Sequence, residues 1–520
     1  MCGILCAYGS KLPKTDISKE RLAHRGPDGF RARTSGSCYM AFNRLAINDT
    51  SDEGMQPFVD GESMLVCNGE IYNHADIALT ENKNDCACLL PLIKKHGILA
   101  ISDMIRGVFA LCYYDGKTFF ASRDPIGIRP LFYTRRTEDS TLIFASEMKV
   151  LPSNGNPIHI FPPGHIYDSS LDRFICYWPG YWPRREIYVS WPFETLKHTL
   201  VEAVRRRITN TDRKLCFLLS GGLDSSLMVA IARKILGPKA HIKTFSIGTA
   251  DSPDCKAALE VAKYLNTDHT EVRFNIQDGL DVLPLVIDSL ESYDTTTVRA
   301  SVPMWLLARH IAEETDYRVV ISGEGSDEIF GGYLYFHYAP SIDDFVAETT
   351  RRLHLLHQFD VLRADRCTAA HGLEVRVPFL DRDFVDCAMR DIDQKLKLVI
   401  SPEQPIEKWV LRKSFEAEGD YLPASILWRQ KDAFSDAVGY SWIGELKNYC
   451  DIVVDEAIMQ EEREMALGHN APLTKEEAFY RCLYRDMYRD PHTISEIWRP
   501  RWTSQLDPSA TMLDTHLKKK

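Results

Sequence analysis

The sequence contains no long apolar run. No stretch of about 18 consecutive apolar residues occurs, so no membrane-spanning helix is predicted. The first residues also lack a basic segment followed by an apolar core, and we therefore expect no signal peptide. Positive charge is in deficit, with 62 Lys and Arg against 73 Asp and Glu and a net charge of −11. This balance disfavours binding to nucleic acid or to an anionic membrane.

The sequence also lacks the cysteine spacing of a disulfide framework or a metal site. Its 14 cysteines are irregularly spaced, and Cys86 and Cys88 are too close together for a usual CxxC site. Reduced thiols are typical of cytoplasmic proteins, so we expect a cytoplasmic location. Most of the cysteines lie in apolar segments, and Cys2 is the exception. With 520 residues, the chain is long enough for two or more domains.

The most informative stretch is the loop from Ser220 to Ser226, Ser-Gly-Gly-Leu-Asp-Ser-Ser. An apolar run at 215–219 precedes it and a helix-compatible run at 227–236 follows, which predicts a strand, a tight loop and a helix. Loop amides and a helix N-terminus together make an anion site. No Gly-Lys-Ser/Thr follows the glycines, so this is not a Walker A loop. An ordinary strand-to-helix turn is the alternative, and the complete motif disfavours it.

This loop resembles the pyrophosphate loop of enzymes that cleave ATP between the α and β phosphates and adenylate a substrate. The resemblance implies an ATP-binding set of Leu219, Ser220, Gly221, Gly222, Leu223, Asp224, Ser225, Ser226, Ile247, Ser322, Gly323 and Lys431. A second glycine-rich loop, 322–333, follows a predicted strand at 317–321 and carries three carboxylates, Glu324, Asp327 and Glu328. These would repel one another without a cation, which indicates Mg²⁺ or an ammonium group there. A solvated acidic turn is the alternative.

We therefore expect Mg²⁺ to be bound with ATP. Asp224 is an acid inside an anion-binding loop, and that placement suits a metal that bridges phosphates. The expected metal ligands are Asp224 and Asp327. Glu324 is the residue that we expect to serve formation of the adenylated intermediate or to deprotonate incoming ammonium.

Cys2 directly follows Met1. If Met1 is removed, Cys2 carries both a thiol and a free α-amine, whose ordinary pKa of about 7.7–8.0 suits a base near neutral pH. Nucleophile and base then come from a single residue. A chance cysteine after the start is the alternative, and Cys2 alone would favour it.

Cys2 is followed by polar blocks at 24–29, 43–48, 68–73, 84–85, 122–127 and 144–149. Together with Cys2 they resemble the class II glutamine amidotransferase domain over roughly residues 2–170. The resemblance implies that Cys2 is the nucleophile and that Asn68 and Gly69 form the oxyanion hole. The implied glutamine-binding residues are Arg44, Leu45, Ala46, Ile47, Asn48, Asn68, Gly69, Glu70 and Asp85, with Arg44 on the α-carboxylate and Glu70 and Asp85 on the α-ammonium.

Each of these residues also has a structural alternative. Arg44 can form a surface ion pair, Asn68 and Gly69 a hairpin turn, and Asp85 a helix cap. For Arg376 and Asp381, in the later segment Gly372 to Asp381, a structural ion pair and a role in the site both stay open.

The expected fold class combines α/β and α+β. An Ntn-type amidotransferase sandwich of antiparallel sheets with helices is expected at 2–170, and an α/β synthetase domain with a parallel nucleotide-binding sheet at 193–490. A linker rich in Trp, Tyr and Pro is expected at 171–192 and a flexible tail at 491–520.

This domain order resembles the glutamine-hydrolysing (B-type) asparagine synthetases. It implies ATP-dependent synthesis of asparagine from aspartate and glutamine through a β-aspartyl-AMP intermediate. The small-molecule partners are then glutamine, aspartate and ATP, and a homodimer stays open. The alternatives are a glutamine-dependent relative that acts on another carboxylate, a phosphoribosyl amidotransferase, and a catalytically dead scaffolding protein. The intact Cys2, Arg44, Asn68 and Asp85 and the complete Ser220 loop disfavour them.

Overall fold

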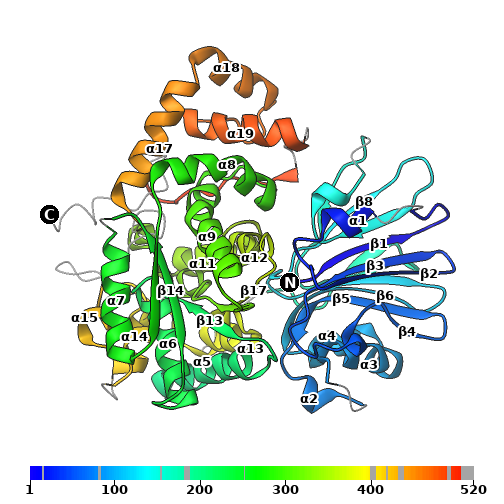
Figure 1. Ribbon diagram of the computed structural model, residues 1–520, viewed down its shortest axis with the longest axis horizontal. Coiled ribbons are helices and arrows are strands. Elements are labelled where there is room, and N and C mark those ends of the chain that lie inside the picture. The colour runs from blue at the N-terminus through cyan, green and yellow to red at the C-terminus, as the bar shows by residue number, and fades with distance from the viewer. Residues whose placement is uncertain are drawn as a thin grey trace.

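The computed structural model describes residues 1–13, 17–79, 83–152, 155–180, 188–250, 252–398, 406–416, 420–430, 438–488 and 493–504. Figure 1 shows an N-terminal domain, coloured blue to cyan, beside a C-terminal domain, coloured green to red. The N-terminus lies between the two domains, next to the strand β17 (Figure 1). None of the described helices is long and apolar enough to cross a membrane.

The N-terminal domain is a sandwich of two six-stranded antiparallel sheets. One sheet has the order β10-β8-β9-β1-β3-β2, with β1 Gly3–Tyr8, β2 Gly29–Ser35, β3 Cys38–Arg44, β8 Phe132–Arg135, β9 Leu142–Ala145 and β10 His159–Ile160. The other has the order β12-β11-β7-β6-β5-β4, with β4 Phe58–Asp60, β5 Ser63–Ile71, β6 Gly107–Tyr114, β7 Phe119–Arg123, β11 His165–Asp168 and β12 Arg173–Cys176. The helices are α1 Ile17–Arg21, α2 His74–Ile77, α3 Leu89–His96 and α4 Ile98–Met104, with short 3₁₀ turns at Asp52–Gly54, Asp85–Cys88 and Met148–Val150.

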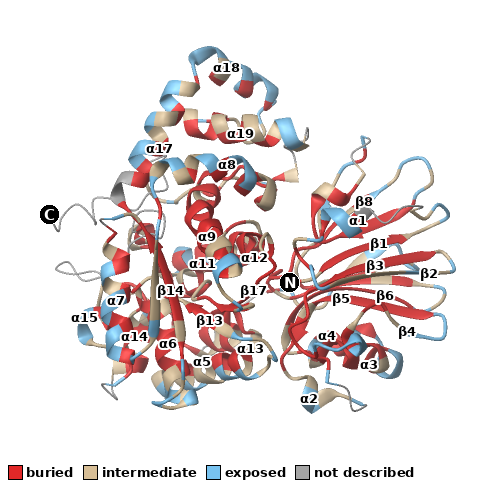
Figure 2. Ribbon diagram, in the orientation of Figure 1, coloured by how far each residue is buried: buried red, intermediate tan, exposed pale blue. Residues whose placement is uncertain are grey.

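Alternation along β5 explains why this domain has two separate cores. Successive side chains of a strand point to opposite faces. Met64 and Val66 face the other sheet, whereas Leu65 and Cys67 pack with buried residues of α3 such as Leu92. Figure 2 shows the resulting buried strands as red bands beneath exposed loop ends. The expected antiparallel sandwich is confirmed.

The C-terminal domain is built on a five-stranded parallel sheet with the order β15-β14-β13-β16-β17. Its strands are β13 Leu215–Leu218, β14 Lys243–Gly248, β15 Asp268–Arg273, β16 Val319–Ile321 and β17 Glu374–Arg376. The helices that accompany the sheet are α5 Pro192–Thr209, α6 Leu223–Leu236, α7 Pro253–Leu265, α8 Ile276–Leu290, α9 Thr295–Glu314, α10 Ser326–Phe330, α11 Ile342–Leu355, α12 Asp360–Ala369, α13 Arg382–Asp386, α14 Trp409–Glu416 and α15 Ala424–Leu427. The helices α17 Tyr440–Val453, α18 Glu456–Met465 and α19 Lys475–Tyr488 form a layer above α8 (Figure 1).

Irregular short helices connect these elements. Their bounds are Leu334–Tyr338, Leu356–Gln358, Pro378–Leu380 and Gln394–Leu396 for the 3₁₀ turns and Cys387–Asp391 for a π-helical turn. The parallel sheet that the sequence predicts for this domain is confirmed. Because β13 and β16 are neighbours, the loops that follow them lie side by side at the carboxyl edge of the sheet.

The structure corrects the start of α9. The sequence predicts a polar stretch at 293–301 and a helix from Val302, but the helix begins at Thr295. Asp294 is its N-cap, since its carboxylate accepts a hydrogen bond from Thr297 N at 2.8 Å.

The C-terminal segment also differs from the expected flexible tail at 491–520. Residues 493–504 pack against the C-terminal domain. Trp498 is 5% exposed, and its backbone N–H donates to Asp294 Oδ1 at 2.6 Å. Residues 505–520 lie outside the described part of the chain.

At the expected linker, β12 pairs with β11 and extends the sandwich past residue 170. Residues 181–187 of the linker are not described.

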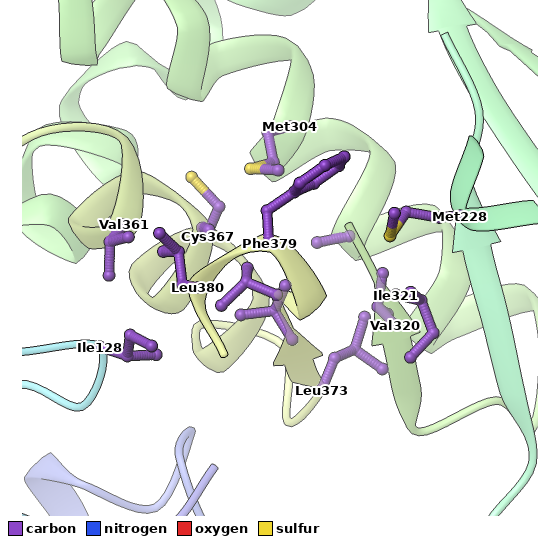
Figure 3. Packing of buried hydrophobic residues seen from close by; sticks show 14 of the residues in the cluster. Ile128, Met228, Met304, Val320, Ile321, Val361, Cys367, Leu373, Phe379 and Leu380 are labelled. Carbon is purple, nitrogen blue, oxygen red and sulfur yellow. The ribbon is translucent and has the colours of Figure 1, made fainter. Parts of the chain in front are cut away.

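The boundary between the domains contains both an apolar cluster and buried ion pairs. Figure 3 shows Ile128, from the N-terminal domain, pointing toward Val361 and Leu380 of the C-terminal domain, within one hydrophobic cluster. Beside this cluster, Arg25 pairs with Asp365 at 2.9 Å. Unpaired charges are costly to bury, so this pairing favours one arrangement of the two domains.

Candidate active sites

The first candidate site is a small pocket at the inner end of the sandwich. β1 and β3 are neighbours in one sheet, and β5 of the other sheet contacts both of them. The three strands therefore bring residues that are distant in the sequence together at this pocket. The pocket is lined by Cys2, Phe42, Arg44, Leu45, Ile47, Asn48, Gly54, Gln56, Cys67, Asn68, Gly69, Glu70, Asn84, Asp85, Cys86 and Glu374. Of the residues that the sequence assigns to glutamine, only Ala46 is not in this lining. The N–H of Ala46 donates to Asp28 Oδ2 at 2.8 Å, so Ala46 shapes the loop instead.

Cys2 lies directly before β1, where its thiol enters the pocket. Leu45 N–H donates to Cys2 Sγ at 3.4 Å. Burial raises the pKa of the Cys2 thiol to about 11, against the lowering effect of the nearby terminal amine. A thiol in this state needs a base to become a thiolate. The Met1 amine that precedes it is also buried, and burial lowers the pKa of that amine to about 6.

Asn68 is the most unusual residue of this pocket. It lies within β5 and is completely buried, yet neither its amide nitrogen nor its amide oxygen has a hydrogen-bond partner among the described residues. An unpaired buried amide is costly. A ligand oxygen beside Cys2 would satisfy its N–H donor. The hairpin-turn alternative is excluded, because Asn68 and Gly69 are paired with Ala110 and Phe109 inside the sheet.

The remaining polar residues of the pocket are held by their neighbours. Arg44 is 5% exposed and its guanidinium donates to the carbonyl oxygens of Asp49 and Ser51, so it is not a surface ion pair. Asp85 Oδ2 accepts from Ile71 N–H at 2.7 Å and does not act as a helix cap. Burial, followed by the charge of Asp85, raises the pKa of Glu70. A ligand ammonium between the two carboxylates would favour their charged forms.

The second candidate site is a larger pocket, with a cavity volume of about 160 Å³, at the carboxyl ends of β13, β14 and β16. The sequence-predicted residues in its lining are Leu219, Ser220, Gly222, Leu223, Asp224, Ser225, Ile247, Ser322, Gly323, Glu324 and Asp327. The loop is held in shape by its own hydroxyls, since Gly222 N–H donates to Ser220 Oγ at 3.3 Å and Ser220 N–H to Ser225 Oγ at 3.2 Å.

Three residues of the predicted ATP set are not in the lining of this pocket. Gly221 has a φ of +75°, and a Cβ there would lie 2.4 Å from Ala258 N, so this glycine permits the turn to pack on α7. Ser226 is buried inside α6. Lys431 lies outside the described residues.

Lys408 is a residue of this site that the sequence analysis missed. Its Nζ lies 2.6 Å from Asp224 Oδ2 and 2.6 Å from Asp327 Oδ1, so it joins the two expected metal ligands. Lys408 is 1% exposed and its backbone has a φ of +57°. Lys408 belongs to no recognisable sequence motif. It reaches the loop only through the tertiary fold, so the sequence gives no signal for it.

The three carboxylates of the second loop each have a separate environment. Asp327 contacts Lys408, and Glu324 Oε2 accepts from Arg363 Nη2 at 2.9 Å. Glu328 accepts from the hydroxyl of Tyr333, and burial, followed by the charges of Asp360 and Asp327, raises the pKa of Glu328. Lys408 and Arg363 therefore offset the expected repulsion, and Lys408 is a cation of the protein's own at this loop.

Arg376 and Asp381 do not pair with each other. Arg376 Nη2 lies 3.1 Å from Glu70 Oε2, and Asp381 Oδ2 lies 2.7 Å from Arg207 Nη1. Arg376 thus connects the C-terminal domain to the first pocket, a connection that the sequence does not indicate.

Comparison with known proteins assigns a family to each domain. A model for the glutamine amidotransferase domain matches residues 1–161, and one for asparagine synthase matches residues 195–348 and 339–517. Asparagine synthetase 3 (glutamine-hydrolyzing) of Arabidopsis thaliana is 41% identical over 98% of this chain and 94% of its own length. The asparagine synthetase (glutamine-hydrolyzing) of Asparagus officinalis is also 41% identical, over 98% of this chain and 92% of its own length.

Proposed function

The chain belongs to the asparagine synthase family, and we propose that it makes L-asparagine from L-aspartate, ATP and the ammonia released from L-glutamine. The products are asparagine, AMP, pyrophosphate and glutamate. One observation carries the proposal: the pocket around Cys2 and the pocket around Ser220 to Ser225 lie in one chain with a packed boundary between their domains.

In the first pocket, Cys2 is the proposed nucleophile. After removal of Met1, its α-amine takes the thiol proton, and the thiolate attacks the side-chain amide carbon of glutamine. The amide of Asn68 and the N–H of Gly69 bind the developing oxyanion. The α-ammonium gives its proton to the leaving nitrogen, ammonia leaves, and water hydrolyses the thioester to glutamate and the free thiol. Arg44, Asn48, Glu70 and Asp85 hold the α-carboxylate and α-ammonium of the substrate.

In the second pocket, the loop from Ser220 to Ser225 is proposed to hold the phosphates of ATP. The β-carboxylate of aspartate attacks the α-phosphorus, giving β-aspartyl-AMP and pyrophosphate. Ammonia then attacks the acyl carbon and AMP leaves. The pair Glu324 and Arg363 offers one anion and one cation, which suits an amino acid substrate better than a simple carboxylate. Lys408 offers a further cation for phosphate.

The residues of this pocket also fit Mg²⁺. Asp224 and Asp327 converge on one point, since Lys408 Nζ is 2.6 Å from an oxygen of each. The buried Asp224 Oδ1 accepts no hydrogen bond within the described residues. Mg²⁺ prefers one or two carboxylates together with substrate phosphates. We propose that Asp224 and Asp327 hold it, and that it neutralises phosphate charge when bound.

Product analysis tests the proposed function. Purified protein with glutamine, aspartate, ATP and Mg²⁺ is expected to form asparagine, AMP and glutamate, and removal of Mg²⁺ with a chelator is expected to stop AMP formation. If no asparagine forms from aspartate, but a different carboxylate is converted to its amide, the result would favour the alternative, a glutamine-dependent synthetase that acts on another carboxylate. The proposal includes a cytoplasmic location, which the absence of disulfides among all 14 cysteines supports. Sedimentation equilibrium decides between a monomer and a homodimer.

Replacing Asn68 with alanine is expected to lower glutaminase kcat by ~10²–10³-fold, because one oxyanion donor is lost. Ammonia-dependent asparagine synthesis should be unchanged. The matched control is Asn156→Ala, since Asn156 is also buried but its side chain accepts from Thr137 N–H, away from the pocket. Equal losses in both variants, or a loss of ammonia-dependent synthesis in Asn68→Ala, would contradict the assignment.

A further inference from the structure

A strand of the C-terminal domain completes the glutamine pocket of the N-terminal domain. β17 is an edge strand of the parallel sheet, yet Glu374 at its start lines the pocket that contains Cys2 and Asn68. The α-amine of Met1 donates to Leu373 O at 3.5 Å. The beginning of the chain therefore rests on the residues that open β17, as the position of the N-terminus in Figure 1 also shows.

Glu374 is held in place as a carboxylate. It is 3% exposed, its Oε1 accepts from Arg376 Nε at 2.8 Å, and its Oε2 lies 3.6 Å from Arg129 Nη2. Burial opposes its ionisation, but Arg376 and Arg129 outweigh burial and lower the pKa of Glu374. A fixed negative charge from the synthetase domain therefore faces the glutaminase pocket.

The charged groups around the terminal amine come from four segments. Burial is the largest influence and lowers the pKa of the Met1 amine, and the charge of Glu374 is the strongest opposing effect. The thiol of Cys2 also raises this pKa, whereas Arg129, in the loop after β7, and Arg25, in the loop after α1, lower it.

Glu374 also acts on the reacting thiol. It raises the pKa of the Cys2 thiol, as does Glu70 on β5. The α-nitrogen of Cys2 lies one residue beyond that of Met1, between the Met1 amine and the Cys2 thiol along the chain. Glu374 thus acts on the groups that flank this nitrogen on both sides.

We propose that Glu374 is a positioning residue of the glutaminase reaction. When the Cys2 α-amine accepts the thiol proton it becomes an ammonium, and the Glu374 carboxylate stabilises that positive charge. The proton moves from Sγ to the α-nitrogen and no other bond changes in this step. Arg25 Nε also holds Cys2 in place, since it donates to Cys2 O at 2.9 Å. The inference rests on the proposed function, and it makes the glutaminase site depend on the synthetase domain.

The test is the pH dependence of glutaminase kcat/KM in Glu374→Gln of the full chain. The acid limb of this profile reports the pKa of the free enzyme's base. Loss of a nearby negative charge lowers the pKa of an amine by roughly one unit or more, so the acid limb should move to lower pH by that amount. Ammonia-dependent synthesis should stay within about twofold of wild type, which shows that the variant is folded. Glu374→Asp keeps the negative charge but places it farther from the amine, so its acid limb should lie between those of wild type and Glu374→Gln.

A matched control breaks another contact between the domains. Arg382 Nη2 lies 3.1 Å from Asp103 Oδ1, so Arg382→Gln loosens the boundary without touching the pocket, and its acid limb should not move. An unchanged acid limb in Glu374→Gln, or the same shift in Arg382→Gln, overturns the inference. If Glu374→Gln does not fold, the limb of Glu374→Asp decides. A wild-type protein that releases no glutamate from glutamine refutes the proposed function instead.

Discussion

Replacing Cys2 with alanine is expected to abolish glutamine-dependent asparagine synthesis and to leave ammonia-dependent synthesis intact. Alanine removes the only atom that we propose as the nucleophile, so glutamate release should fall on the order of 10³-fold or more. The second pocket is built from β13, β14, β16 and their loops, and none of the residues in its lining comes from the N-terminal domain. The measurement is asparagine formation with glutamine and, separately, with an ammonium salt.

The matched control for this experiment is Cys176→Ala. Cys176 is an exposed thiol at the end of β12, far along the chain from the pocket, and its loss should change neither activity. If Cys2→Ala makes no asparagine from ammonium salts while remaining folded, the two reactions are not separate. If it still hydrolyses glutamine at the wild-type rate, Cys2 is not the nucleophile.

Local patterns in the sequence predict most of the architecture. The apolar run from Met64 to Cys67 predicts the first part of β5, and the apolar run followed by two glycines predicts the turn between β13 and α6. The start of α9 is predicted wrongly because Thr295 to Val298 have low helix propensity, and a capping bond from Asp294 and burial against the core outweigh it.

Contacts between distant segments are what the sequence does not indicate. Lys408 reaches Asp224 across 184 residues, and Arg376 reaches Glu70 from a different domain. No short motif records such pairs, because each depends on how whole elements pack. For the same reason, the sequence of the second loop predicts that a cation is present but not which one. In the structure, Asp327 contacts Lys408, Glu324 contacts Arg363, and Glu328 accepts a hydrogen bond from Tyr333.

Replacing Glu324 with glutamine is expected to block asparagine formation from either nitrogen source. Glu324 is part of the second pocket, directly after the strand β16 and the turn at Ser322 and Gly323. Its Oε2 lies 2.9 Å from Arg363 Nη2 of α12. Positioned proton transfer contributes ~10²–10⁴-fold, so asparagine formation should fall by that order. ATP binding should survive, because the glutamine side chain at position 324 occupies the same volume as the glutamate that it replaces.

The stage at which Glu324 acts is decided by following ¹⁸O from the β-carboxylate of aspartate into AMP in the Glu324→Gln variant. Transfer of ¹⁸O without asparagine would place Glu324 at the ammonia step, where a carboxylate removes a proton from incoming ammonium. Loss of the transfer would place it at adenylation, where the negative charge of Glu324 opposite Arg363 is needed to hold the substrate correctly. Glu313→Gln, at an exposed position of α9, is the control and should retain both transfer and product. Asparagine synthesis at the wild-type rate in Glu324→Gln would leave Glu324 as a structural partner of Arg363 alone, because an amide can accept that hydrogen bond but cannot take up the proton.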